Sequence, residues 1–142
     1  FGEKVHSPIV TPGEADAVVG LEKLEALRFA HYLNIETGTV LVNDHELVPG
    51  SVPNAESIYP RETIDFLKSK GMRVVALPAS QTARDLGDAR MANVVMLGAL
   101  STLLPIEQEV WEKTLKLRIP AKYLDGNLKA FESGYDAMQK AI

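Results

Sequence analysis

The hydrophobic pattern is strongest between residues 87 and 104, where nearly every position is apolar. One set of apolar side chains follows the spacing of a helix face: Ala92, Val95, Met96, Ala99, Leu100 and Leu103. Because Val94, Leu97 and Leu104 make the opposite side apolar too, we expect a helix that is buried on several sides. A helix of about 14 residues is too short to span a membrane. We therefore place this segment in the core of a globular domain.

Short apolar runs elsewhere predict the strands of a sheet. Residues 16–21, 39–42 and 73–77 are apolar enough for buried strands. Residues 4–10 fit an edge strand, because Pro8 lacks a backbone donor. Helical segments separate the three buried runs, so we expect parallel strands joined by right-handed crossovers. The predicted fold class is α/β, a three-layer, Rossmann-like parallel sheet with helices on both faces.

Helical spacing predicts the segments that connect these strands. Residues 22–33 form the first helix, and a second helix begins near Pro60. Its apolar face is predicted to consist of Ile64, Phe66 and Leu67.

Polar residues and glycines mark the expected helix ends. Gly71 is placed to end the second helix. Ser80 or Thr82 is predicted to cap a short helical turn that ends at Gly87, and Asp88 to cap the buried helix that follows.

Two further helices close the chain. Residues 105–118 place Val110, Thr114 and Leu117 on one face. Residues 122–142 carry an apolar stripe with alternating spacings of four and three: Leu124, Leu128, Phe131, Tyr135, Met138 and Ile142. The stripe has two interpretations, a helix docked on its own domain or a contact between two copies of the chain in a homodimer.

The composition limits the classes of function. The chain has 142 residues, the size of one domain, and a net charge of −4 with scattered Lys and Arg side chains. We therefore expect no nucleic-acid partner, and the pattern predicts no signal peptide and no membrane span. Because the chain has no cysteine, it holds no disulfide, thiolate-bound iron–sulfur cluster or cysteine zinc site. The absence of disulfides is compatible with the cytoplasmic location that we expect.

The densest polar cluster directly follows the second buried run. Asn43, Asp44 and His45 begin a long connection that extends to Pro60. Ligands of open parallel sheets bind beyond the carboxyl ends of the strands, so these residues are candidates for ligand or partner binding. The alternative is a solvated turn that serves backbone geometry. Consecutive side chains point in different directions, and we predict no metal site here.

Arg90 and Asn93 are the other candidates for ligand or partner binding, at the start of the buried helix. Asn93 is either a buried amide that bonds a loop carbonyl or a ligand contact near a helix N-terminus, where anions are favoured. Arg90 either adds charge to such a site or is a solvated surface residue. The chain lacks a Gly-x-Gly fingerprint, a phosphate loop and a Gly-x-Ser-x-Gly elbow, so we predict no catalytic residue.

Four groups of segments, in order along the chain, carry a family resemblance. They are residues 13–16 with 21–28, residues 38–43, residues 86–88 with Asn93 and 97–99, and Asn127 with 130–131 and 134–135. Together they resemble the small subunit of indolepyruvate:ferredoxin oxidoreductases and, more broadly, the gamma-type domain of 2-oxoacid:ferredoxin oxidoreductases. The resemblance covers residues 1–142 as a single domain of this type.

The resemblance implies an accessory subunit of an enzyme that decarboxylates an arylpyruvate, transfers the acyl group to coenzyme A and reduces ferredoxin. Thiamine diphosphate and the iron–sulfur clusters are expected in a larger partner subunit, ferredoxin is met through the complex, and coenzyme A is a candidate ligand. One alternative is the gamma subunit of a pyruvate or other 2-oxoacid enzyme. Another is a non-enzymatic module that self-associates.

This sequence departs from the family at its start. Family members carry a strand and a glycine-rich Gly-x-Gly-Gly-x-Gly turn that these residues lack. The three buried runs also make a thin sheet. We therefore expect both features upstream of Phe1, in a sequence that is truncated at its N-terminus. The alternative is a real deletion, which would remove the central strand and the phosphate binding of that turn.

Overall fold

The structure is a computed structural model that describes residues 4–5, 7–48, 50, 54 and 59–142. Its centre is a parallel sheet of β1 (Ala17–Gly20), β2 (Thr39–Asn43) and β3 (Arg73–Leu77), in the order β1-β2-β3. The predicted α/β class and the parallel pairing of the three strands are confirmed. Burial throughout is confirmed for β2 alone, because Val19 of β1 and Arg73 of β3 are exposed. The edge strand predicted at residues 4–10 is wrong for the residues described there. These residues are exposed and pair with no strand, and Pro8 has no backbone N–H to donate to a neighbouring strand.

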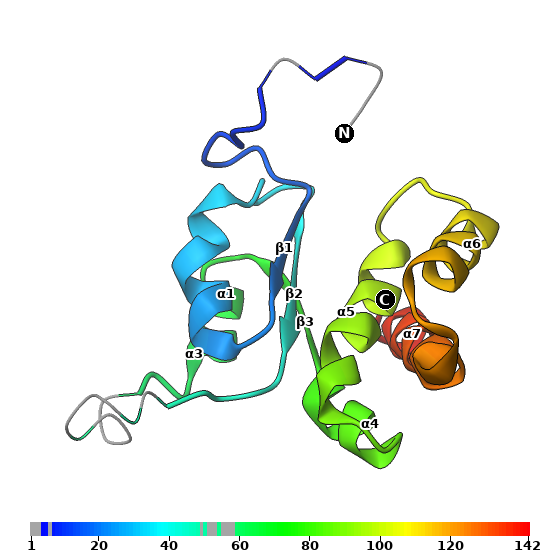
Figure 1. The fold of residues 1–142 in the computed structure, drawn as a ribbon. Coiled ribbons are helices and arrows are strands. Elements are labelled where there is room, and N and C mark those ends of the chain that lie inside the picture. The colour runs from blue at the N-terminus through cyan, green and yellow to red at the C-terminus, as the bar shows by residue number, and fades with distance from the viewer. Residues whose placement is uncertain (1–3, 6, 49, 51–53, 55–58) are drawn as a thin grey trace.

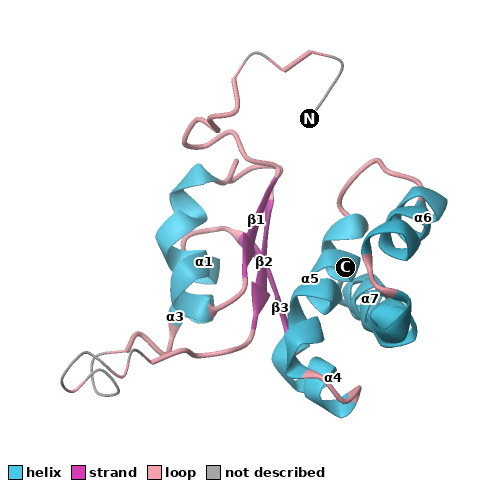
Figure 2. Cartoon of the chain, viewed as in Figure 1, coloured by secondary structure: helices cyan, strands magenta, loops and turns pink. Residues whose placement is uncertain are grey.

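Helices cover both faces of the sheet (Figures 1 and 2). On one face lie α1 (Lys23–Phe29), the 3-10 turn η1 (Ala30–Tyr32) and α3 (Thr63–Ser69). The other side carries the remaining elements: α4 (Ala79–Asp85), the 3-10 turn η2 (Ala89–Met91), α5 (Ala92–Ser101), α6 (Gln108–Arg118) and α7 (Ala121–Ala141).

The middle strand β2 joins two hydrophobic cores. All five of its residues are buried. Successive side chains of a strand point to opposite faces, so Val40 and Val42 pack in the core beneath α1 and α3, while Leu41 packs in the core beneath α5. The register places Val40 beside Val18 and Leu41 beside Val75, which continues each core across the neighbouring strands.

Several predicted helix details need correction. Phe66 is 49% exposed, beneath the Lys70 ammonium, so it does not widen the buried face of α3. Ser80 and Thr82 lie inside α4, whose N-cap is Pro78, and neither caps it. Gly71 has a φ of +83° just after α3 ends at Ser69, which confirms the predicted helix end.

The predicted buried helix is shorter than its apolar run. It consists of η2, capped by the Asp88 carboxylate as predicted, and α5, which ends at Ser101. Leu103 and Leu104 lie beyond it and are half-buried. Among the helices of the described residues, none is long and apolar enough to cross a membrane.

The apolar face predicted for α6 is wrong. Val110 and Leu117 are 53% and 78% exposed, whereas Leu115 is buried. Trp111 lies one turn before Leu115 and meets the ring of Phe131 at 6.0 Å between centroids. Helix α6 therefore carries two apolar stripes. The stripe of Trp111 and Leu115 packs against α7, and the stripe of Val110 and Leu117 faces solvent.

Helix α7 docks on its own domain, as the first interpretation of its stripe predicted. Phe131 and Met138 are buried against the rest of the chain, and Ala130 and Met138 belong to the core beneath α5. Ile142 is 57% exposed, so the buried stripe ends before the last predicted position.

Two glycines bring the backbones of α5 and α7 into direct contact. A Cβ atom on Gly98 would overlap the carbonyl group of Phe131, and a Cβ atom on Gly134 would overlap the carbonyl group of Val95. Since both obstacles are backbone atoms of the facing helix, no side-chain rotation relieves them. Any larger residue at either position must push the two helices apart.

We predict that Gly134→Ala lowers the free energy of unfolding by about 3 kcal/mol or more, because overpacking here displaces a helix rather than a side chain. The matched control is Gly126→Ala in the same helix. Its Cβ would lie 3.2 Å from the flexible thioether of Met91, and alanine gains up to about 1 kcal/mol of helix propensity. Urea unfolding measures both variants. Equal stabilities for the two would contradict the proposed backbone contact.

Candidate functional site

At the carboxyl edge of the sheet, Asn43 is a buried structural tie. Its side chain is 3% exposed, and its Nδ2 donates to the carbonyl of Leu21 at 3.0 Å and to Ser80 Oγ at 2.8 Å. Its Oδ1 accepts from the Ser80 amide at 3.1 Å. Asn43 thereby links the ends of β1 and β2 to the start of α4. Both amide hydrogens are used, so no donor remains for a ligand.

Asp44 belongs to a network of ion pairs on the same edge. Lys23 Nζ lies 2.7 Å from Asp44 Oδ1 and 3.2 Å from Glu46 Oε1, and Arg61 reaches the other oxygen of Glu46 at 2.7 Å. The hydrogen bond that the Lys23 ammonium donates to the Asp44 carboxylate is the main cause of the raised pKa of Lys23. These cations are matched by carboxylates of the chain itself.

Glu22 fastens two further segments to the start of α1. One carboxylate oxygen caps the helix by accepting from the Glu25 amide at 3.0 Å. The other accepts from the Leu47 amide at 3.3 Å and from the hydroxyl of Tyr59. The residues just after β2 and just before α3 are thus held together.

His45 takes part through its backbone, where its carbonyl accepts from the Lys23 amide at 3.0 Å. The predicted candidates Asn43, Asp44 and His45 therefore do not converge on one point. Their contacts favour the alternative interpretation, a structural turn.

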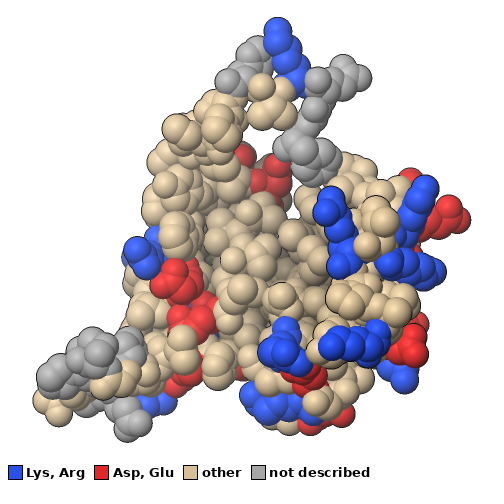
Figure 3. All heavy atoms as spheres, viewed as in Figure 1, with Lys and Arg blue, Asp and Glu red and all other residues tan. Residues whose placement is uncertain are grey.

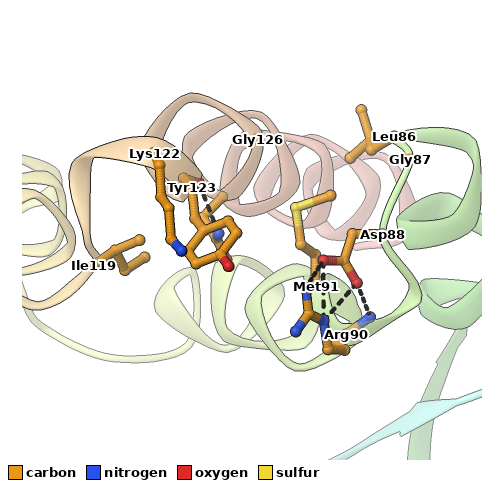
Figure 4. Close-up of a pocket in the computed structure, with 10 residues that line it drawn as sticks. Leu86, Gly87, Asp88, Arg90, Met91, Ile119, Lys122, Tyr123 and Gly126 are labelled. Atoms are coloured by element: carbon orange, nitrogen blue, oxygen red, sulfur yellow. Dashed lines mark hydrogen bonds and ion pairs between the residues drawn. The ribbon is translucent and has the colours of Figure 1, made fainter.

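Arg90 lines a groove on the other side of the molecule. The groove has a volume of about 390 Å³ and lies between η2 and the first turns of α7 (Figure 4). Its apolar part includes Met91, Ile119 and Gly126. Its polar part is made of Asp88, Arg90, Lys122, Tyr123 and Asn127.

Asp88 holds the guanidinium of Arg90 in place. Arg90 Nε lies 3.0 Å from both carboxylate oxygens, and Nη2 lies 2.6 Å from Oδ2. Asp88 Oδ1 also accepts from the Arg90 amide at 2.9 Å, which caps η2. These hydrogen bonds from Arg90 lower the pKa of Asp88 to about 2 and raise the pKa of Arg90. The ion pair is therefore charged throughout the neutral range.

Tyr123 stands between two cations. Lys122 Nζ lies 4.6 Å from the centre of its ring, and the Arg90 guanidinium carbon lies 5.8 Å from it. Figure 4 shows the Lys122 ammonium beside this ring and the Arg90–Asp88 pair across from it. Both distances lie within the range of cation–π attraction, so the ring helps to position the two charges.

Asn93 lies apart from this groove, and the prediction that its amide is buried is wrong. The residue is exposed on α5. The sequence of α5 is apolar on most sides, which led us to expect burial on several sides. The neighbouring elements leave the side that carries Asn93 exposed to solvent. Of the two residues predicted at this helix start, Arg90 alone lines the groove.

Sequence reasoning missed Lys122 and Tyr123. Both residues lie more than thirty positions after Arg90, too far for a local sequence pattern to connect them. The docking of α7 against η2 brings Lys122 and Tyr123 close to Arg90. The Asp88-x-Arg90 spacing could have predicted the ion pair, because a capping carboxylate at the start of a helical turn can reach the side chain of a cation two residues later. Within the described residues, no group of three or more His, Cys, Asp or Glu side chains could hold a metal ion.

Comparison with known proteins identifies the family. The family model described as pyruvate ferredoxin/flavodoxin oxidoreductase matches residues 1–137, so the chain belongs to this family. The resemblance predicted from the four groups of segments is confirmed, as is the oxidoreductase class.

The similar curated proteins include subunits of two kinds of oxidoreductase. The chain is 32% identical to the indolepyruvate oxidoreductase subunit IorB of Thermococcus kodakarensis, over 100% of this chain and 72% of that protein. It is 35% identical to the IorB subunit of Archaeoglobus fulgidus, over 93% of this chain and 67% of that protein. It is also 31% identical to the ketoisovalerate oxidoreductase subunit VorA of Methanothermobacter marburgensis, where 99% of this chain covers 26% of that protein.

A solved structure has the same fold. It is the gamma subunit of a keto/oxoacid ferredoxin oxidoreductase from Geobacter sulfurreducens, with a TM-score of 0.67 and 26% sequence identity. The match covers 93% of this chain and 69% of that chain.

We predict that Asn43→Ala lowers the free energy of unfolding by about 2–3 kcal/mol, because it leaves a buried amide and carbonyl without their partners. The matched control is Asn93→Ala, on an exposed position, which should change stability by less than about 0.5 kcal/mol. Thermal and urea unfolding measure both. If the two variants are equally stable, Asn43 is not the tie described here.

A second prediction concerns how the stability of the fold depends on pH. Asp88→Asn keeps a capping side chain but removes the charge, so the variant isolates the ion pair. The folded pKa of Asp88, about 2, lies below the ordinary value of 3.8. The wild type should therefore exceed the variant in stability above about pH 4, and this advantage should fade as the pH drops toward 2. Unfolding at a series of pH values measures the difference, and an advantage that persists at pH 2 would contradict the ion-pair explanation.

Proposed function

We propose that this chain is the accessory subunit of an oxidoreductase that acts on aryl 2-oxoacids such as indolepyruvate. The enzyme would decarboxylate the acid oxidatively, form the acyl-coenzyme A and reduce ferredoxin. The observation that carries the proposal is the sequence identity of 30–35% to four IorB subunits, of which the chain covers 67–72%. In the VorA proteins the same region makes up 26% of a longer polypeptide.

The chemistry of the chain supports an accessory role. It has no cysteine, so it offers no thiolate to an iron–sulfur cluster. Thiamine diphosphate is bound through a divalent cation, and no group of three or more His, Cys, Asp or Glu side chains among the described residues could hold a metal ion. We place both cofactors in a larger partner subunit, through which ferredoxin is also met.

The groove beside Arg90 does not suit coenzyme A. The cofactor carries several phosphate charges, whereas the groove beside Arg90 also presents the carboxylate of Asp88. We therefore place the main coenzyme A contacts outside this groove. The cytoplasmic location and the homodimer stay predictions.

A second candidate is the gamma subunit of an enzyme for another 2-oxoacid. The identity of 28–31% to two ketoisovalerate VorA subunits and the likeness to a keto/oxoacid gamma subunit favour it. The third interpretation, a self-associating module, loses its main support because the α7 stripe is largely buried within the chain.

Co-expression with a large subunit that binds thiamine diphosphate and iron–sulfur clusters tests the proposal. We expect the two chains to copurify and to reduce ferredoxin with indolepyruvate, with a kcat/KM about tenfold or more above that for pyruvate or ketoisovalerate. The isolated chain should give no turnover, because it lacks both cofactors. A preference for an aliphatic 2-oxoacid would favour the second candidate. Turnover by the isolated chain, or failure of the two chains to associate, would overturn the proposal.

A further inference from the structure

The groove between η2 and α7 combines charge with an apolar wall. Arg90 and Lys122 supply two positive charges and Asp88 one negative charge, so a single positive charge remains. Lys122 has no carboxylate partner in the part of the chain that the structure describes. On the face shown in Figure 3, Lys and Arg side chains gather over the half that α4 to α7 form, although the whole chain carries a net charge of −4.

Asp88 orients Arg90 without using all of its donors. The carboxylate engages Nε and Nη2, which leaves Nη1 outside that ion pair. A fixed guanidinium loses little conformational freedom when a ligand arrives. Lys122, beside the ring of Tyr123, faces the same hollow from α7 (Figure 4).

Two glycines keep the hollow open. A Cβ atom on Gly87, where φ is +99°, would meet nothing within 4 Å, and one on Gly126 would meet only the end of Met91. Met91 and Ile119 give the hollow its apolar lining, and the ring of Tyr123 is 43% exposed. The volume of about 390 Å³ is in the range of small-molecule sites.

We propose that this groove binds an aromatic monocarboxylate, with its carboxylate attracted by Lys122 and Arg90, the two cations that flank Tyr123, and its ring against Tyr123 and Met91. The charge balance selects this class, because one negative charge on the ligand neutralises the groove. A phosphate dianion would exceed that charge and leave a net negative charge beside Asp88, which repels a dianion more strongly than a monoanion. A neutral ring would leave Lys122 without an anion, because Asp88 already pairs with Arg90. Because the chain is proposed as an accessory subunit, we infer that the groove holds the acid rather than reacts with it.

The identity of the natural ligand rests on the proposed function, since aryl 2-oxoacids belong to this class. The binding chemistry does not rest on it, and three probes of equal ring size test it. Phenylpyruvate is the monocarboxylate, phenyl phosphate the phosphate and phenylacetamide the neutral compound. Calorimetric titration into the 142-residue chain, with far-UV circular dichroism as the check of folding, measures each.

We expect saturable binding of phenylpyruvate, weaker binding of phenyl phosphate and none of phenylacetamide. Lys122→Met should weaken phenylpyruvate binding about tenfold, the usual value of one charge-assisted hydrogen bond. The matched control is Lys129→Met, on the same helix but outside the groove, and it should bind as the wild type does. Tyr123→Leu, which keeps both charges, should weaken binding as well.

Three results would overturn the inference: no saturable binding of phenylpyruvate, equal affinity in Lys122→Met and the wild type, or tighter binding of phenyl phosphate. These results are independent of the copurification test. An active complex with aryl preference whose accessory chain binds no phenylpyruvate would refute the groove alone. Lysine-dependent binding by a chain that joins no oxidoreductase would refute the proposed function alone.

Discussion

The backbone contact between α5 and α7 is the constraint on which the helical side of this fold depends. Gly98 and Gly134 permit it, because a Cβ atom at either position would occupy the space of a facing carbonyl. The close approach lets Met96 and Met138 share one core with Leu41 of the sheet. Dispersion contacts fall off steeply with distance, so a small separation of the helices would weaken every contact in that core.

The same crossing determines where a ligand can bind. It fixes the start of α7 beside η2 and so builds the groove from two helices that are distant in the sequence. At the carboxyl edge of the sheet, where ligands of such folds are expected, the chain instead satisfies its own polar groups through Asn43, Glu22 and Lys23. The accessory role proposed here agrees with this arrangement, since the polar groups at that edge serve the structure of the chain.

Sequence patterns predicted the sheet well and the outer helices less well. The run 39–42 was recognisable because a strand buried on both faces is continuously apolar. Its two neighbours, β1 and β3, are only partly buried but are also short, largely apolar runs. Helix α6 misled the prediction because Trp111 and Leu115 form a second stripe beside Val110 and Leu117, and periodicity cannot say which stripe meets a neighbour. Asn93 was misplaced for a related reason, since an apolar helix still has one open side.

The candidate site was predictable only in part. Arg90 was found from its place at a helix start, but its relation to Lys122 and Tyr123 depends on the tertiary contact of α7. The carboxyl-edge residues were located correctly, yet their hydrogen bonds to Ser80 and Lys23 come from segments that the sequence does not connect. The family, by contrast, was recognisable from four groups of segments in a fixed order along the chain. Recognising that order requires no knowledge of which residues are in contact in the fold.

Native-state hydrogen exchange of the backbone amides tests the central claim most directly. If the glycine crossing locks α7 to α5, amides near Val95, Ala99, Phe131 and Gly134 should exchange only through one shared opening, with the same free energy and the same dependence on denaturant. That free energy should match that of the buried strand β2. Exchange of α7 at a much lower free energy than α5, as for a helix resting loosely on the surface, would contradict the account.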